Sequence, residues 1–148
     1  MEYCLNDARI DDKTFIYQTK KDSIKKYVES IWGWSEEYQI QDFEESFALL
    51  NNFKIICSAD ESIGFLEIYE NDKLINITEV HINPNFQGKG IGSRIINEII
   101  CEAKGKNKKV TVGCFKKNNG AVKLYLKLEF KIIEETETHY LFEYNHAV

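Results

Sequence analysis

The chain is 148 residues long, which suits one domain over residues 1–148, and its 43% hydrophobic and 29% charged residues are typical of globular proteins. A net charge of −5 without a basic face argues against a nucleic-acid binder, and no stretch is long and apolar enough to cross a membrane. The opening residues, MEYCLNDARIDDK, carry acids and no apolar segment, so we expect no secretory signal and a cytoplasmic protein.

The first half of the chain changes from helical to strand patterns. Ile24, Val28 and Ile31 recur at helical spacing, whereas three later runs are rich in β-branched and aromatic residues. Short polar turns at Asp60-Glu61 and Asn71-Asp72 join these runs and predict an antiparallel meander. In chain order we predict a strand at 3–8, a helix from Asp11 or Asp12, a second helix capped by Ser35 with Phe43 and Phe47 inward, and strands at 53–59, 62–70 and 73–82.

The second half alternates helices with strands. Pro84 lacks an N–H and therefore ends the pairing of the strand at 73–82. The remaining predicted elements are a helix to about Lys104, a strand at 109–115, a helix at 118–128 and closing strands at 130–135 and 139–144. The complete order is βααβββαβαββ, which predicts a mixed α/β fold.

Cysteine spacing bears on metal binding and redox state. Cys4, Cys57, Cys101 and Cys114 are far apart, with no C-x-x-C pair among them. Zinc ligands usually come in close pairs because a short loop must place two of them on one ion. We therefore expect no metal site and predict reduced, mostly buried cysteines.

Three glycines, Gly88, Gly90 and Gly92, lie within five residues directly before a helical run. The first N–H groups of a helix have no intrahelical partner, and glycines let a backbone approach an anion closely, so this stretch predicts a diphosphate cradle. A dinucleotide fingerprint would need G-x-G-x-x-G and an acid after the next strand, which are absent. A P-loop would need Gly-Lys-Ser/Thr where this chain has Gly92-Ser93-Arg94.

A different motif fits these residues. Gln87-x-x-Gly90-x-Gly92 resembles the Q/R-x-x-G-x-G/A acyl-CoA motif of the GNAT (Gcn5-related) N-acetyltransferases. The segment NNGAVKLYLKLEF at 118–130 resembles that family's N-x-x-A-x-x-L-Y-x-K-x-G-F segment, although Glu129 stands where glycine is usual. Both motifs occur in the family's order, and the likeness covers nearly the whole chain.

The resemblance implies a fold and a cofactor. The fold is a single GNAT-like α/β (α+β) domain, with a central mixed, mostly antiparallel sheet flanked by helices. Its fourth and fifth strands splay apart, and the pantetheine arm of acetyl-CoA lies between them. The implied cofactor contacts are the backbone near Val80 and Ile82 for the pantetheine amides, the diphosphate loop Gln87, Gly88, Lys89, Gly90, Ile91, Gly92 and Ser93, and Asn118 from the opposite side.

The implied chemistry is acetyl transfer from acetyl-CoA to a primary amine by direct attack on the thioester, without a metal. Tyr125 matches the family's general acid, although a core tyrosine is the alternative, and a backbone N–H near Val80 is the expected oxyanion donor. The family often places its base where this chain has Asn76 and Thr78, which cannot act as bases. Glu79, acting through water, is our candidate base, with a surface glutamate in a cross-strand pair as the alternative. We expect the neighbouring His81 to be a partly buried strand residue.

Acceptor choice in this family depends on the first two helices and their connection. Trp34, Glu36 and Glu37 are candidate contacts to a cationic amine. A solvated helix face is the favoured interpretation of the acids, and Trp32 fits the core, whereas Trp34 lies at the break between the helices, where a side chain can face the cleft. The acceptor would be a small-molecule amine or a protein amino group, and a homodimer is possible in this family. The competing function is a non-catalytic acyl-CoA sensor or regulatory module.

Overall fold

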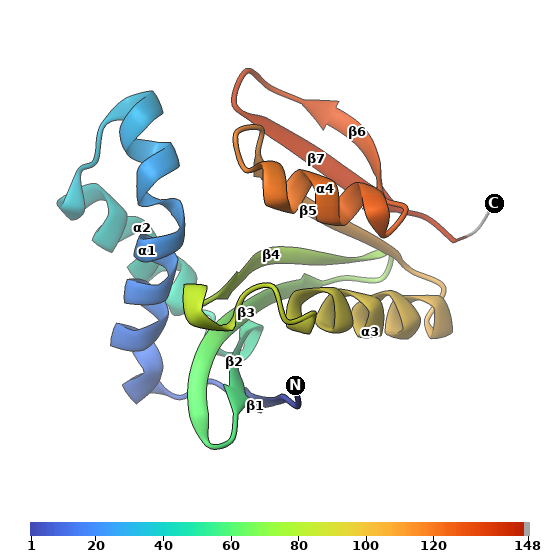
Figure 1. The fold of residues 1–148 in the computed structure, drawn as a ribbon, viewed down its shortest axis with the longest axis horizontal. Helices are drawn as coiled ribbons and strands as arrows, with labels where there is room; N and C mark the ends of the chain where they lie inside the picture. The colour runs from blue at the N-terminus through green and yellow to red at the C-terminus, as the bar shows by residue number, and fades with distance from the viewer. Residues whose placement is uncertain (147–148) are drawn as a thin grey trace. The chain divides into compact units, whose positions relative to one another are not determined.

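The structure is a computed structural model that describes residues 1–146, so the predicted boundary at residue 148 lies outside the described residues. Its helices and strands follow the predicted order (Figure 1). They are β1 (Cys4–Asp7), α1 (Lys13–Trp32), α2 (Glu36–Phe47), β2 (Phe53–Ser58), β3 (Glu61–Glu70), β4 (Leu74–Ile82), α3 (Ile91–Gly105), β5 (Lys109–Phe115), α4 (Asn119–Lys127), β6 (Lys131–Glu135) and β7 (His139–Tyr144). The short 3-10 turns are η1 (Ile10–Asp12), η2 (Leu50–Asn52) and η3 (Pro84–Phe86).

The strands of the described region form one 7-stranded sheet in the order β1-β2-β3-β4-β5-β7-β6. The pairs β1–β2, β2–β3, β5–β7 and β6–β7 are antiparallel, and β4 pairs with β5 in parallel. A parallel pair needs a crossover connection, which α3 supplies between β4 and β5. The predicted α/β (α+β) class with a mixed, mostly antiparallel sheet is confirmed.

Contacts along the chain define two compact units. The first unit contains Met1–Glu67 and Glu79–Lys89, and the second contains Ile68–Thr78 and the chain from Gly90 onward. Strands β3 and β4 each pass from one unit into the other.

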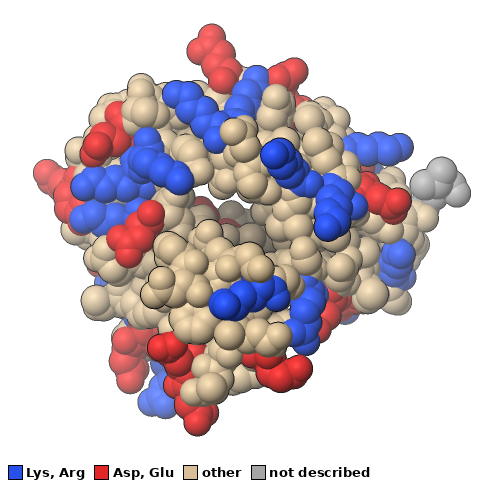
Figure 2. Space-filling model, in the orientation of Figure 1, with Lys and Arg blue, Asp and Glu red and all other residues tan. Residues whose placement is uncertain are grey.

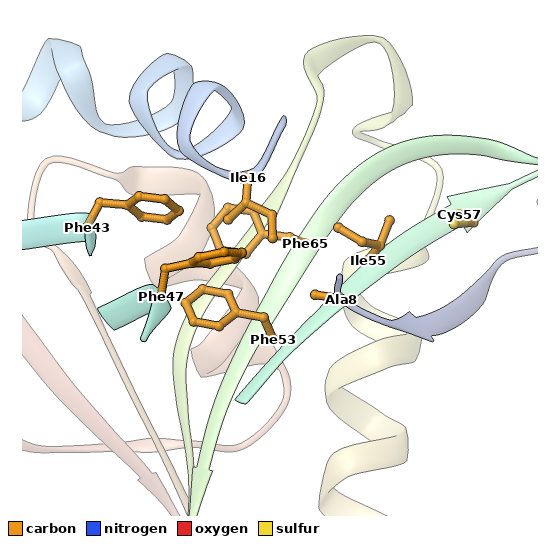
Figure 3. Close-up of a cluster of buried hydrophobic side chains, with 8 residues drawn as sticks. All are labelled: Ala8, Ile16, Phe43, Phe47, Phe53, Ile55, Cys57 and Phe65. Carbon is orange, nitrogen blue, oxygen red and sulfur yellow. The ribbon is translucent and has the colours of Figure 1, made fainter. Parts of the chain in front are cut away.

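The core of the first unit is aromatic. Phe43 and Phe47 of α2 are buried as predicted, and they pack against Phe53 of β2, which in turn stacks on Phe65 of β3. Figure 3 shows these rings together with Ile16 of α1 in one cluster. The complete cluster is Ala8, Ile16, Phe43, Phe47, Phe53, Ile55, Cys57 and Phe65. This packing holds α1 and α2 against β2 and β3.

The second unit has an aliphatic and aromatic core. Helix α3 packs against β5 and buries one apolar face. On α4, Tyr125 contacts the ring of Phe142 in β7 at 5.3 Å and the ring of Phe130 at 5.7 Å between centroids. The buried members from α3 and β5 are Ile91, Ile95, Ile96, Ile99, Ile100, Ala103, Val110 and Val112.

Several local predictions are corrected by the structure. Asp12 is the N-cap residue of α1, as the predicted helix start requires, but its carboxylate accepts from the Arg9 N–H of the preceding turn at 2.8 Å and not from an N–H of the helix. The first hairpin turn is Ala59-Asp60, one residue earlier than predicted, with φ values of 49° and 65°. Trp32 is 63% exposed and lies outside the core, because α1 ends there. The predicted Ser35 cap is confirmed, since its side chain accepts from Tyr38 N–H at 3.2 Å.

The cysteines are also more exposed than predicted. Only Cys57 is buried, Cys114 is partly buried, and Cys4 and Cys101 are exposed.

Lys and Arg side chains are interspersed with Asp and Glu side chains on the face drawn in Figure 2. Among residues 1–146, no helix combines the length and apolar character that a membrane span requires.

Glu129, which replaces the glycine usual in the second motif, has a φ of 70°. It ends α4 in a Schellman motif, in which Phe130 N–H donates to the Tyr125 carbonyl and Glu129 N–H donates to the Leu126 carbonyl. This left-handed conformation is strained for any residue with a β-carbon. The resemblance therefore fails at a position where the backbone geometry is still the one glycine favours.

Replacing Glu129 by Gly is expected to raise the free energy of unfolding by about 1 kcal/mol, because it removes the left-handed strain. The Glu129→Ala variant keeps a β-carbon at the same φ and is the matched control, with no gain expected. Chemical denaturation followed by circular dichroism measures both. An equal gain in the two variants would show that loss of the charge, rather than of strain, stabilises the chain.

Candidate active site

The loop between β4 and α3 has the backbone geometry of an anion site. Gly88 and Gly90 have φ values of 74° and 82°, in the left-handed region that residues with a β-carbon disfavour. Gly90 is the N-cap of α3 and supplies no side chain to the helix end. The first bond into the helix is Arg94 N–H to the Gly90 carbonyl at 3.1 Å. The N–H groups of the residues from Ile91 to Ser93 therefore have no intrahelical acceptor and lie at the positive end of the helix dipole.

Gln87, the first residue of the acyl-CoA motif, holds the start of this loop. Its side-chain amide donates to the backbone carbonyl of Ile82 at 2.8 Å, at the last residue of β4. The bond ties the loop to the strand before the glycines begin. The backbone near Ile82 is predicted to contact the pantetheine, and the Ile82 carbonyl already accepts one hydrogen bond and keeps a second lone pair for another.

Strands β4 and β5 pair over only part of their length. The parallel register runs from Leu74 with Lys109 to Ile77 with Val112, although β4 continues to Ile82 and β5 to Phe115. A pairing that ends while both strands continue matches the splayed fourth and fifth strands that we expected.

A polar chain occupies the two positions where the family often has its base. The Asn76 amide donates to the Thr111 hydroxyl at 2.7 Å, and the Thr78 hydroxyl donates to the Asn76 side-chain oxygen at 2.9 Å. These groups satisfy one another and have no proton acceptor of suitable basicity. A base must therefore come from another residue.

Asn118 and Tyr125 are both held in place within the second unit. The Asn118 side-chain oxygen caps α4 by accepting from the Ala121 N–H at 3.2 Å, which leaves its NH₂ group as the donor for the predicted pantetheine contact. Tyr125 is only 4% exposed and packs against Phe130 and Phe142. Its ring is fixed by aromatic neighbours, which suits either a positioned acid or a core residue.

Glu79, the candidate base, lies in a cluster of charged side chains within the first unit. One carboxylate oxygen is 3.5 Å from the Lys20 ammonium of α1, and the other is hydrogen-bonded to the His81 ring. Burial raises the pKa of Glu79, but the hydrogen bond and charge of His81 and the charge of Lys20 outweigh burial and hold the pKa below its ordinary value. Glu79 is therefore an ion at neutral pH. The His81 side chain is 16% exposed, which agrees with the partly buried strand residue we expected.

The model of the acetyltransferase (GNAT) family matches residues 16–130 of this chain. The chain belongs to that family.

Relatives of known structure agree with the family in their fold. The PaiA N-acetyltransferase of Thermoplasma acidophilum, solved in complex with coenzyme A, is 20% identical and superposes with a TM-score of 0.78 over 99% of this chain and 100% of its own. Naa50 of Arabidopsis thaliana, in complex with the bisubstrate analogue CoA-Ac-MVNAL, is 15% identical with a TM-score of 0.69, covering 98% of this chain and 99% of its own. At these identities the matches establish the GNAT fold.

A curated relative is also similar in sequence. An uncharacterised N-acetyltransferase of Methanocaldococcus jannaschii is 26% identical over 110 residues, which are 71% of this chain and 48% of the relative. The chain thus spans about half the length of this relative.

Glu67 of β3 is a buried acid, electrostatically coupled to the candidate base Glu79, that we did not predict. It is 8% exposed and closes a run of five buried residues, Ile63–Glu67. Burial, then the negative charge of Glu79, raises the pKa of Glu67 to about 7, while Lys20 acts in the opposite direction. An acid at the end of the apolar run IGFLE is the sequence signal that could have identified it.

The predicted acceptor contacts lie at the start of α2, with partners of their own. The Glu36 carboxylate accepts from the Trp34 ring N–H at 2.6 Å, from the Tyr17 hydroxyl at 3.0 Å and from the Lys21 ammonium at 2.9 Å. These hydrogen bonds, that of Trp34 first, lower the pKa of Glu36 to about 2. Glu36 thus already has a cationic partner, whereas Glu37 is exposed. The acceptor role of Trp34, Glu36 and Glu37 stays a prediction.

Within residues 1–146, no three acids, histidines or cysteines are grouped as a metal site would require.

Proposed function

We propose that the protein is an acetyl-CoA-dependent N-acetyltransferase that transfers an acetyl group to a primary amine by direct attack on the thioester. The observation that carries this proposal is the start of α3 at the left-handed Gly90, where the N–H groups of Ile91, Gly92 and Ser93 have no intrahelical acceptors and the N-cap provides no side chain to bond them. In a member of the GNAT family, an anion site at this point of the acyl-CoA motif fits the diphosphate of acetyl-CoA.

The residues of the motif take separate tasks in this proposal. The backbone from Gln87 to Ser93 binds the diphosphate, with Lys89 adding positive charge at the loop. The backbone of Val80 and Ile82 binds the pantetheine arm, and a Val80 N–H stabilises the oxyanion. Tyr125 donates its hydroxyl proton to the departing thiolate of CoA.

The acceptor is an amine, and two classes fit. The complex of Naa50 with CoA-Ac-MVNAL supports a peptide amino group as one class. The acidic balance of this chain, with 24 acids against 19 bases, supports a cationic small-molecule amine as the other. A cytoplasmic location, where acetyl-CoA is available, and a possible homodimer belong to the same proposal.

Release of the CoA thiol from acetyl-CoA tests the function across spermidine, aminoglycosides, amino acids and short peptides. We expect turnover with one class, and a fall in kcat of about 100-fold or more in Tyr125→Phe with the affinity for acetyl-CoA unchanged. The phenylalanine keeps the ring packing on Phe130 and Phe142, so a folded variant is expected. Tight binding of acetyl-CoA without thiol release by the wild type would instead support the sensor function.

A further inference from the structure

Glu67 is a buried residue whose carboxyl group has no counter-ion. Among residues 1–146, no ion pair or hydrogen bond to this carboxyl is found, although only 8% of the residue is exposed. Lys20, the cation that acts on it electrostatically, forms its ion pair with Glu79. An ionised carboxylate in this position is unfavourable unless a cation or a proton joins it.

The register of β3 and β4 places Glu67 beside Glu79. The Ile63 carbonyl accepts from the Asn83 N–H at 2.8 Å, and two residues along, the Phe65 ring lies 5.4 Å from the His81 ring. Two residues further, the same alternation brings Glu67 and Glu79 to one face of the two strands. The two carboxyl groups therefore form a cross-strand pair.

The two members of this pair have different surroundings. His81 and Lys20 bind both oxygens of Glu79, which keeps that carboxylate ionised. Glu67 faces the negative charges of Glu79 on β4 and Asp42 on α2, and the positive charge of Lys20 on α1. When two neighbouring acids have environments that give them different pKa values, the acid with the lower pKa stays ionised and the acid with the higher pKa gains and loses the proton.

We propose that Glu67 is the general base that takes the proton from the acceptor ammonium, and that Glu79, fixed by His81 and Lys20, is a positioning residue that supplies the negative charge beside it. This inference rests on the proposed acetyltransferase function. It replaces Glu79 as candidate base, because a carboxylate held ionised by two partners is a poor acceptor of a further proton. The missing counter-ion of Glu67 is then the ammonium group of the acceptor.

The steps balance in atoms and charge. Glu67 takes one proton from R–NH₃⁺ and leaves the neutral amine with a free electron pair. The amine nitrogen attacks the thioester carbon, the C–N bond forms, and the C–S bond breaks with its electron pair on sulfur. The nitrogen loses its second proton when the amide forms, and the thiolate gains one proton from Tyr125. The nitrogen's proton restores the Tyr125 hydroxyl, so the products are the amide and CoA–SH. Glu67 releases its proton to solvent, one per turnover.

The pH dependence of kcat/KM in Glu67→Gln tests the assignment, with an amine that the wild type acetylates. For the wild type we expect a rise up to about pH 7, where Glu67 loses its proton. In Glu67→Gln this rise should disappear, and kcat/KM at pH 7 should fall about 100-fold or more. The loss should shrink as the pH approaches the pKa of the free amine. Glu61→Gln, an exposed glutamate at the start of the same strand, is the matched control and should behave as the wild type.

Each outcome separates the two proposals. Glu67→Gln with kcat/KM within threefold of the wild type, and the same rise near pH 7, would overturn the role of Glu67 while leaving the acetyltransferase function intact. A wild type that binds acetyl-CoA but acetylates no amine would overturn both. Acetyl-CoA affinity, measured by calorimetry, should be equal in the wild type and Glu67→Gln, and a weaker affinity in the variant would show a general structural defect and count against the base.

Discussion

Replacing Gly64 by Ala is expected to lower the free energy of unfolding by about 3 kcal/mol, at the upper end of the usual range for overpacked sites. A β-carbon at Gly64 would lie 2.2 Å from the carbonyl oxygen of His81 and 3.1 Å from its carbonyl carbon. Both atoms belong to the backbone of β4, so no side-chain rotation relieves the contact. The strands β3 and β4 would have to move apart.

Gly113 offers a matched control in another strand. A β-carbon there would lie 3.5 Å from the carbonyl oxygen of Tyr140, which is an ordinary van der Waals contact. Gly113→Ala is therefore expected to change the free energy of unfolding by less than about 0.5 kcal/mol. Guanidinium denaturation followed by circular dichroism compares both variants with the wild type. Equal denaturation midpoints for the two alanine variants would contradict the close approach at Gly64.

The close approach at Gly64 also bears on the active site. It sets the distance between the strands that carry Phe65 opposite His81 and, two residues on, Glu67 beside Glu79. A folded Gly64→Ala protein should therefore lose acetyl transfer, and acetyl-CoA binding should weaken with it, because the added β-carbon would also lie 3.0 Å from the Cα of Ile82, whose carbonyl holds Gln87.

The order of helices and strands could be predicted because their signals are local. Ser35 caps α2 as expected, and the β5 boundaries at Lys109 and Phe115 follow directly from its β-branched run. The first hairpin turn was placed one residue too late because Ala59-Asp60 adopts two positive φ values without the Asn or Gly that usually signals them. Trp32 fits the core by its apolar character, but it is the last residue of α1 and is 63% exposed, which the residue type alone does not indicate.

The candidate site also has a part that the sequence predicts and a part that it does not. The glycine loop is a local backbone feature, so its residues could be named from spacing, and the left-handed φ values of Gly88 and Gly90 agree with that interpretation. The surroundings of a carboxyl are not local. Glu79 has its partners on α1 and on its own strand, and Glu67 has its neighbours on α1, α2 and β4. No spacing along the chain indicates which of two acids is paired with a lysine and which is not.

Glu67→Gln is expected to stabilise the protein above neutral pH, in contrast to its effect on catalysis. The folded chain raises the pKa of Glu67 from an ordinary value of 4.5 to about 7, so the folded state binds this proton more tightly than the unfolded state does. The contribution of Glu67 to stability is therefore greatest below about pH 4.5 and is lost as the pH rises to about 7. At about 1.4 kcal/mol per pKa unit, the ionised carboxylate costs about 3 kcal/mol at pH 8. Glutamine, which is neutral at every pH, avoids this cost.

Urea denaturation of both proteins at pH 5, 6, 7 and 8 measures the difference, which should be small at pH 5 and grow to about 3 kcal/mol at pH 8. Glu79→Gln is the control of opposite sign: because the folded state lowers the pKa of Glu79, its loss should destabilise the protein at neutral pH and matter less as the pH falls. A constant difference between Glu67→Gln and the wild type would mean that Glu67 titrates as an ordinary glutamate. A carboxyl group that serves the fold should not destabilise the folded protein at the pH where the enzyme works. If Glu67→Gln is more stable than the wild type and turns over more slowly, the carboxyl group of Glu67 therefore serves catalysis and not the fold.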